Sequence, residues 1–224
     1  MAAGEGRRLR PLTHRWPKPA LPIGGRPVVV TVVRELAAAG CSPVTVVTGH
    51  LAEQVEALLG GSGFGAELVF ARQPRPDGSA DAVSRALAAG ATPPLVVATA
   101  DTVFRRGDIA AFVREFASGA RPGAVAVRRE PPPGGTRAGV AVEAGLVRRI
   151  VAAGETPFAH ASLWAFAEGL LPYLQGLGGP PYELAEAYQR AIDDGREVSA
   201  FEVGRTRDLT DPLDLVKENF SYLS

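Results

Sequence analysis

Cysteine, histidine and lysine are scarce in this chain. Their scarcity limits, in turn, the disulfides it can form, the zinc sites it can hold and the lysines that can serve in a site. Cys41 is the single cysteine, so the chain cannot form an internal disulfide, and we expect a reducing compartment. The three histidines are scattered, without the spacing of a zinc site. Lys18 and Lys217 are the only lysines, and every other basic residue is arginine. A lysine kept in such a chain can be needed for its compact ammonium group, and Lys217 lies in a polar stretch, so Lys18 is the candidate.

Net charge and long apolar runs are also lacking. Basic and acidic side chains balance at 24 each, whereas a protein that binds nucleic acid is expected to carry a basic excess. No apolar run has the length of a membrane span, and the first residues lack the apolar stretch of a signal peptide. We therefore expect a cytoplasmic protein with no nucleic-acid or membrane partner. Hydrophobic residues make up 46% of the 224 residues, which is enough for one sizeable core.

The order of apolar and helical segments predicts the fold. Through residue 119, short β-branched runs alternate with helical segments, many of which end at glycine, a pattern typical of a parallel α/β sheet. The predicted strands are 42–49, 66–72 and 93–101, and the predicted helices are 27–40, 51–61, 79–90 and 107–119. Beyond residue 120 the predicted strands are 123–130, 138–145, 147–153, 157–166 and 197–204, with helices at 180–195 and 211–223. We expect a single domain over residues 1–224, with a parallel half at 1–119 and a mixed-sheet half at 120–224.

The opening stretch, MAAGEGRRLRPLTHRWPKPALPIGGRP, has the composition of a phosphate-binding loop. Gly4 and Gly6 permit positive φ and a close approach of a ligand to the backbone, whose N–H groups can hold phosphate oxygens. Four arginines and Lys18 place five cations within residues 7–18. A solvated basic arm is the alternative, but Pro11, Pro17, Pro19 and Pro22 stiffen the segment, as a mobile arm would not require. The loop therefore indicates a polyphosphate site.

The same stretch resembles the signature of the sugar-1-phosphate nucleotidylyltransferases, through A-A-G-x-G-x-R-L-x-P-L-T, P-K-P and L-P-I-x-x-R-P. The resemblance implies a Rossmann-like, GT-A-like fold with a mixed, mostly parallel sheet flanked by helices. It divides the single domain into a nucleotide-binding half at 1–119 and a sugar-phosphate-binding half at 120–224. It also implies that Arg8 and Lys18 act as catalytic residues on the triphosphate. Gly6 and the backbone of Ala2, Ala3 and Gly4 would bind the nucleotide, with the latter three against the base.

A second match lies at QPRPDGSA, which resembles the glucose-1-phosphate thymidylyltransferases in particular. There Gln73 and Gly78 fall on the positions that read the base edge. A glutamine amide can donate and accept hydrogen bonds together, as a pyrimidine edge requires. The alternative is a surface turn in which Ser79 caps the next helix.

Two aspartates are the predicted magnesium ligands. Asp101 ends a buried strand, where open α/β sheets bind their ligands, and Mg²⁺ is held by one or two carboxylates plus phosphate oxygens. Asp208, in RDLTDPLDL, falls on the second ligand position of the resemblance. The alternative for Asp208 is a turn or helix-capping aspartate, for which Asp211 is the better candidate.

The sugar half departs from the resemblance. The family has Glu-Lys-Pro in a central strand, whereas this chain has Glu155-Thr156-Pro157 and no lysine there. Arg148 or Arg149 would have to substitute, with a different reach and geometry. Glu183 is the predicted sugar-binding residue, and helix capping is its alternative role.

The family's glycine loop follows a strand that is central in the sheet. Here Met1 stands where that strand should be ending. The expectation is that the first strand is truncated, with Met1 near the middle of the sheet and its neighbours incompletely paired.

The predicted function is a Mg²⁺-dependent nucleotidyltransferase, in which a sugar 1-phosphate attacks the α-phosphate of a nucleoside triphosphate. The products are a nucleoside-diphosphate sugar and pyrophosphate. The alternative is a non-catalytic relative that binds nucleotide or sugar phosphate as a regulatory subunit, which the missing lysine and strand favour. The sugar and the oligomeric state stay open, a homo-oligomer included, and a pyrimidine base is favoured.

Overall fold

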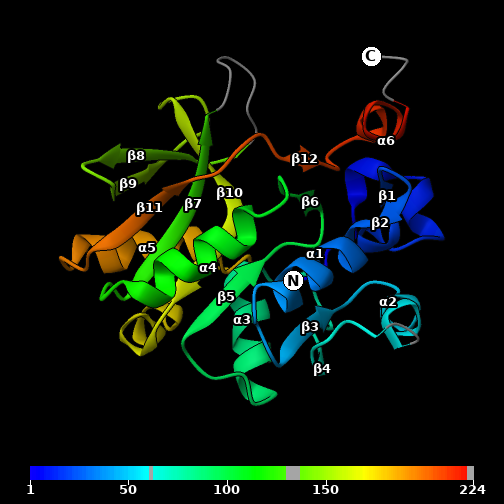
Figure 1. Cartoon of the computed structure of the whole chain (residues 1–224), viewed down its shortest axis with the longest axis horizontal. Helices are drawn as coiled ribbons and strands as arrows, with labels where there is room; N and C mark the ends of the chain where they lie inside the picture. Colours follow the sequence, from blue (N-terminus) through cyan, green and yellow to red (C-terminus); the bar gives the residue numbers. More distant parts are fainter. Residues whose placement is uncertain (61–62, 130–136, 221–224) are drawn as a thin grey trace.

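The computed structural model describes residues 1–60, 63–129 and 137–220 and has an α/β architecture (Figure 1). The last residue of the predicted strand 123–130 and the final residues of the predicted helix 211–223 lie outside the described parts. In the first half, strands and helices alternate at the predicted places. The strands are β3 (Val44–Thr48), β4 (Leu68–Arg72) and β5 (Leu95–Ala98), and the helices are α1 (Val28–Ala38), α2 (Ala52–Gly60), α3 (Ser79–Ala88) and α4 (Asp108–Ser118).

Helix α1 illustrates why these segments fold as predicted. Six of its apolar side chains are buried, and they lie on the face that packs into the core. Gly40 follows the helix with φ 86°, a left-handed conformation that ends helices at low cost when the residue is glycine. The chain then enters β3, which pairs in parallel with β4 from Val44 opposite Leu68 onward.

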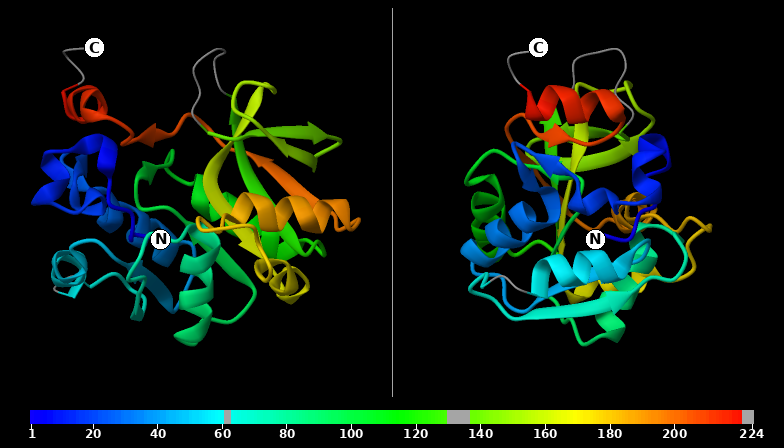
Figure 2. Two further views of the ribbon diagram at one scale, coloured as in Figure 1. Left: turned by 180° about the vertical axis from the view of Figure 1, so that it is seen from behind. Right: turned by 90° about the vertical axis from the view of Figure 1, so that its right-hand side faces the viewer.

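The first two residues lie between β3 and β5. Ala2 forms an isolated parallel bridge with Thr48, and its amide donates to Val47 O at 2.7 Å. The Met1 amino group donates to Ala98 O at 2.7 Å, and the Ala100 amide donates to Met1 O at 2.8 Å. The N-terminus lies inside the outline of the molecule in every view of Figures 1 and 2. Met1 therefore lies between β3 and β5, which belong to two separate sheets and are not paired with each other.

The opening loop folds into short 3₁₀ turns at Arg7–Leu9, Leu12–His14 and Lys18–Ala20, followed by a small hairpin of β1 (Pro22–Ile23) and β2 (Arg26–Pro27). The closing helix α6 (Pro212–Asn219) lies beside this hairpin, as Figure 2 shows. The Asn219 side chain donates to Pro22 O at 2.8 Å. The end of the opening loop and the closing helix thus lie side by side.

The largest sheet has the strand order β5-β10-β7-β11-β9-β8. Its second-half strands are β7 (Gly123–Arg129), β8 (Gly139–Glu143), β9 (Leu146–Val151), β10 (Phe158–Phe166) and β11 (Val198–Glu202). Among the described strands of this sheet, neighbours are antiparallel except β7 and β11. β8 also pairs with β10 through Gly139 and Ala159, so five strands close into a ring.

The α/β class and the mixed sheet with helices are confirmed, but the prediction of a mostly parallel sheet is wrong. β8 and β9 follow one another through a short connection and pair as antiparallel neighbours, whereas a parallel pair needs a crossover of a dozen or more residues.

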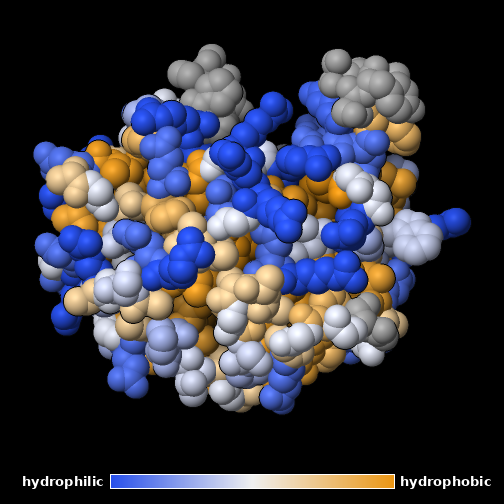
Figure 3. All heavy atoms as spheres, viewed as in Figure 1, coloured by the Kyte–Doolittle hydropathy of each residue, from blue (hydrophilic) through white to orange (hydrophobic). Residues whose placement is uncertain are grey.

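The remaining elements are a helical cover on the large sheet and a pair of two-residue strands. A 3₁₀ segment at Glu168–Leu174 and helix α5 (Leu184–Asp193) cover one side of the large sheet, where Trp164 packs against Tyr188. Two-residue strands β6 (Thr102–Val103) and β12 (Arg207–Asp208) pair with each other. On the face seen in Figure 3, hydrophilic side chains form a band across the middle and upper part, with apolar side chains between and below them. No helix in the described parts of the chain is both long and apolar enough to cross a membrane.

Candidate active site

The glycine loop is held close to the end of β3. Gly6 has φ 62°, and a methyl group there would lie 2.9 Å from Thr13 Cγ2. The Thr13 hydroxyl donates to Gly6 O at 3.0 Å, which fixes the turn. Gly49 follows β3, and a methyl group there would lie 2.6 Å from Ala3 O. Gly49 is a site residue that the sequence analysis missed, and its position directly after a buried strand was the available signal.

The five cations of the loop have different environments. Arg7 and Arg10 share Glu5, with Nε–Oε2 2.8 Å and Nη2–Oε2 3.3 Å. Arg8 is exposed and makes no ion pair within the described residues. Arg8 is therefore free to meet a ligand, and no ion pair has to break first.

Lys18 reaches the end of β5. Its Nζ lies 2.5 Å from Asp101 Oδ2, and the side chains are 16% and 29% exposed. Burial opposes ionisation of Asp101, but Lys18 outweighs it, with Arg137 adding to the effect, and the pKa of this carboxyl is lowered to about 2. The Asp101 carboxyl is thus ionised at neutral pH.

The two predicted metal ligands lie together. Asp208 in β12 is paired with Thr102 in β6, which directly follows Asp101. The Thr102 hydroxyl lies 2.8 Å from Asp208 Oδ1 and 3.2 Å from Asp101 Oδ1. One hydroxyl therefore contacts both carboxylates, although the aspartates are 107 positions apart.

Two arginines that the sequence analysis did not select hold Asp208. Arg128 Nη1 lies 2.5 Å from Oδ2 and Arg137 Nη2 lies 2.5 Å from Oδ1, with both arginines 15% exposed. Arg128 stands near the end of β7 after five buried residues, which places it at a strand end, as with Asp101. The expectation for Arg148 and Arg149 is not met, because Arg148 pairs with Glu143 at 3.1 Å on an exposed edge and Arg149 is exposed.

A strained residue lies beside these arginines. Ser162 has φ 60° at the irregularity between His160 and Trp164 in β10. Non-glycine residues rarely adopt this conformation, and such strain gathers at functional sites. Burial first, and then the charges of Arg137 and Arg128, lower the pKa of His160 to about 4, so this imidazole is neutral at pH 7.

Gln73 and Gly78 form one local unit. The Gln73 amide group donates to Gly78 O and to Asp81 Oδ2, both at 2.9 Å. Gly78 has φ 107°, and a methyl group there would lie 2.2 Å from Tyr182 O. Gly78, rather than Ser79, is the N-cap of α3, and the turn joins α3 to the segment before α5, since the Ala80 amide donates to Tyr182 O.

Glu183 occupies the N-cap position of α5 but makes no side-chain capping hydrogen bond to that helix, and its carboxylate instead meets the start of α3. Its carboxylate accepts from the Ser79 hydroxyl, and the Leu184 amide donates to Ser79 Oγ at 2.8 Å. The two helix starts are thereby tied to each other. Glu183 also lines the pocket described next, so its sugar-binding role stays a prediction.

One pocket of about 270 Å³ gathers most of the predicted residues from the two halves of the chain. Its lining includes Ala2, Ala3, Gly4, Gly6, Lys18, Gln73, Gly78, Asp101 and Glu183. Asp208 is connected to this pocket through Thr102, and Arg8 lies on the loop above it. The described residues include no group of three or more histidine, cysteine or acidic side chains arranged to hold a metal ion. Mg²⁺ needs only one or two carboxylates beside phosphate oxygens and water.

Comparison with known proteins gives consistent matches. The model of the nucleotidyl transferase family matches residues 1–217. The low-salt glycan biosynthesis nucleotidyltransferase Agl11 of Haloferax volcanii is 27% identical over 229 residues, covering 98% of this chain and 64% of that protein. A glucose-1-phosphate thymidylyltransferase of Streptomyces antibioticus is 28% identical over 236 residues, covering 100% of this chain and 65% of that protein. The chain thus spans just under two thirds of the length of these relatives.

Among solved structures, a Bacillus anthracis protein described as a glucose-1-phosphate thymidylyltransferase, crystallised with sucrose, superposes with a TM-score of 0.85. The match covers 97% of this chain and 91% of that one at 21% identity, which shows a shared fold. Because the family model covers nearly the whole chain, the protein belongs to the nucleotidyl transferase family, as its resemblance to the sugar-1-phosphate nucleotidylyltransferases predicts.

Proposed function

We propose that this protein transfers a nucleotidyl group from a pyrimidine nucleoside triphosphate to a sugar 1-phosphate and releases pyrophosphate. The observation that carries the proposal is the convergence of the glycine loop, Lys18, Gln73 and Asp101 on one pocket. Each comes from a different element, and together they offer donors for phosphate, an amide for a base and a carboxylate for a metal.

The triphosphate is proposed to lie along the glycine loop. Gly4 is exposed, and a methyl group there would meet no atom within 4 Å, so the backbone is open to a ligand. Lys18 lines this pocket, and Arg8 lies on the loop. Fixed positive charge at these points stabilises the negative charge that develops on the phosphates during transfer.

The base preference follows from the Gln73 amide. Its nitrogen is committed to Gly78 O and Asp81, so its oxygen remains to accept a hydrogen bond. An accepting oxygen suits a ring N–H, which uracil and thymine carry and cytosine lacks. We therefore propose a uridine or thymidine triphosphate as the nucleotide.

Asp101 and Asp208 fit Mg²⁺ in donor type and in proximity, since both are carboxylates in contact with one hydroxyl. When bound, the ion would neutralise and orient the phosphates. Asp101 would supply one oxygen while Lys18 keeps the other. Asp208 would have to release one of its arginines, and that arginine would then be free to hold a phosphate.

Arg128 and Arg137 are proposed to hold the sugar phosphate in place of the missing lysine. They are the partly buried cations on the sugar-binding half beside Asp208. An arginine fork can bind phosphate through two parallel hydrogen bonds. Holding the attacking phosphate in line with the α-phosphorus lowers the barrier by positioning, and no covalent intermediate is needed.

The non-catalytic relative stays the second candidate, since one observation favours it. Both Asp208 oxygens are engaged by arginines, which leaves this carboxylate less available to a metal. In that case the protein would bind nucleotide or sugar phosphate and transfer nothing.

The discriminating experiment is pyrophosphate release from UTP, dTTP, CTP, ATP and GTP, each with a panel of sugar 1-phosphates and Mg²⁺. We expect release with UTP or dTTP that depends on the sugar phosphate. Lys18→Ala should abolish it, and Lys217→Ala, at the other lysine, should not. Binding seen as a rise in melting temperature, with no pyrophosphate from any pair, would support the non-catalytic relative instead.

A further inference from the structure

A carboxylate contacts the glutamine that is proposed to bind the base. Asp81 lies in the first turn of α3, and its side chain is 15% exposed. The Gln73 amide nitrogen donates to Asp81 Oδ2 and to Gly78 O, both at 2.9 Å. Gln73 lines the pocket of about 270 Å³, whereas Asp81 is not part of the lining found among the described residues. Asp81 is thus placed to act on a ligand through Gln73, without touching the ligand.

The two partners of the Gln73 amide fix its orientation. A main-chain carbonyl oxygen and a carboxylate oxygen only accept hydrogen bonds, so the NH₂ end of the amide must face them. Both N–H groups are then used, and the carbonyl Oε1 is the end left over for a ligand. Turning the amide over would set Oε1 against two acceptors and leave both bonds unmade. Gly78 contributes its main chain, so Asp81 is the partner whose side chain sets this orientation.

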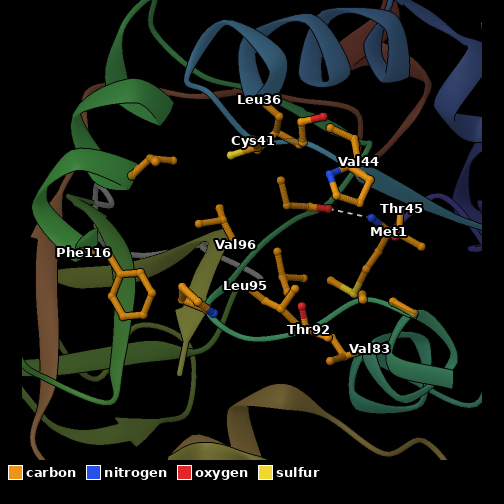
Figure 4. A pocket seen from close by; sticks show the side chains of 18 of the residues that line it. Met1, Leu36, Cys41, Val44, Thr45, Val83, Thr92, Leu95, Val96 and Phe116 are labelled. Carbon is orange, nitrogen blue, oxygen red and sulfur yellow. Dashed lines mark hydrogen bonds between the residues drawn. The ribbon is translucent and has the colours of Figure 1, made fainter. Parts of the chain in front are cut away.

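Asp81 is held in place by a helix that packs on the core. Ala80, Ala82 and Val83 of α3 are buried. Val83 lines the apolar cavity of about 730 Å³ between β3 and β5, and Figure 4 shows it on the side opposite Leu36. Residues two apart in a helix do not share a face, so the packing of Val83 leaves Asp81 on another side of α3, where it meets Gln73.

We propose that Asp81 sets the base specificity, by holding the Gln73 carbonyl toward the pocket so that uracil or thymine is accepted and cytosine is refused. The inference rests on the proposed function. Uracil and thymine carry a ring N–H that can donate to Oε1, whereas cytosine has an acceptor nitrogen in that place. Two acceptors that face each other in a pocket leave both without a donor, and that costs binding free energy. Asp81 is therefore a positioning residue and not a catalytic one.

Two simpler roles for Asp81 depend on its charge. A carboxylate in the first turn of a helix is stabilised by the helix dipole, and Asp81 pairs with Arg85, four residues on, at 3.2 Å. Neither role depends on which end of the Gln73 amide faces the pocket. The proposed role instead needs an acceptor oxygen and no charge, so a neutral asparagine should fill it.

The test measures the dissociation constants of UTP, dTTP and CTP with Mg²⁺ present, which requires no turnover. The unaltered chain should bind UTP or dTTP more tightly than CTP. Asp81→Leu removes the acceptor, and the preference over CTP should fall about tenfold, the size of one hydrogen bond to a carboxylate. Asp81→Asn removes the charge but keeps an acceptor, so it should keep the preference. Arg85→Met is the matched control, because it breaks the ion pair and leaves the carboxylate, and it should also keep the preference.

The outcomes separate this inference from the proposed function. If Asp81→Leu weakens the binding of all three nucleotides equally, Asp81 only supports the fold, and the inference is overturned while the function stands. A preference for CTP in the unaltered chain, or a lost preference in Asp81→Asn or Arg85→Met, would overturn it as well. Absence of binding by all three nucleotides would overturn the proposed function and this inference with it. Asp81→Ala, which removes the acceptor without adding bulk, should match Asp81→Leu and replaces it if that variant does not fold.

Discussion

Variants of the Lys18–Asp101 pair can separate an effect on the stability of the fold from an effect on catalysis. The pKa of Asp101 is lowered from 3.8 to about 2 although burial opposes its ionisation, with Lys18 the largest of the opposing influences. A decrease of this size corresponds to roughly 2–3 kcal/mol in favour of the charged carboxylate. Because both side chains are less than one third exposed, solvent screens little of this energy.

A double-mutant cycle measures the pair. Lys18→Met leaves a buried carboxylate without its partner, Asp101→Asn leaves the ammonium without its partner, and the double variant removes both charges. We expect an interaction energy of about 2 kcal/mol at pH 7 from urea unfolding, with the double variant more stable than the single effects predict. Lys217→Met, at an exposed position on α6, is the control and should change stability by less than about 0.5 kcal/mol.

Pyrophosphate release from the same variants completes the test. Restored stability in the double variant should not restore turnover, because the phosphate-binding ammonium is gone. An interaction energy near zero would refute the claim that the pair is electrostatically coupled. Full turnover in Lys18→Met would refute the role of Lys18 on the phosphates, whatever the unfolding data show.

Three further outcomes are expected. Gly78→Ala would place a methyl group 2.2 Å from Tyr182 O at φ 107°, and it should lower the free energy of unfolding by at least about 3 kcal/mol. Gly90→Ala is the control, because a methyl group there meets no atom within 4 Å, and it should cost less in the same urea titration. Burial holds the pKa of His160 at about 4 in the folded protein, compared with 6.5 for an ordinary histidine. As the pH falls, the unfolded chain therefore takes up a proton first, and the free energy of unfolding should fall by about 3 kcal/mol between pH 6.5 and pH 4. His160→Gln should remove this loss. Chelation with EDTA should abolish pyrophosphate release, and added Mg²⁺ should restore it; turnover that persists in EDTA would contradict the metal assignment.

The first half of the fold could be predicted because its signals are local. Each helix there has a periodic apolar face, and glycine stands at or just after most of the ends, as Gly40 does after α1. The closure of the second half could not be predicted, since it depends on one bridging pair, Gly139 with Ala159, that leaves no pattern in the sequence. The short connection between β8 and β9 does carry information on antiparallel pairing.

The candidate site likewise combines residues that local motifs indicate with residues that only the tertiary fold brings together. Gln73, Gly78 and Lys18 lie in motifs, so the sequence singles them out before any contact is known. Arg137 has no motif, and its place beside Asp208 results from tertiary packing. The meeting of Asp101 with Asp208 was anticipated through the resemblance, but its physical cause is the two-residue pairing of β6 with β12, which is too short to have a periodicity.

The first residues of the chain connect the sheet to the candidate active site. Met1 and Ala2 line the pocket of about 270 Å³, and their ladder bonds to Val47, Ala98 and Ala100 hold the glycine loop to the neighbouring strands. A two-residue bridge has few bonds to resist fraying, and chain ends open at lower free energy than a continuous central strand. The loop also has a contact of its own, because the Thr13 hydroxyl donates to Gly6 O at 3.0 Å. Thr13→Val removes this hydrogen bond and should weaken nucleotide binding, while the melting temperature falls by only about 2–4 °C. If nucleotide affinity stays constant in Thr13→Val, the loop is positioned by the bridge of Met1 and Ala2 and not by its own contact.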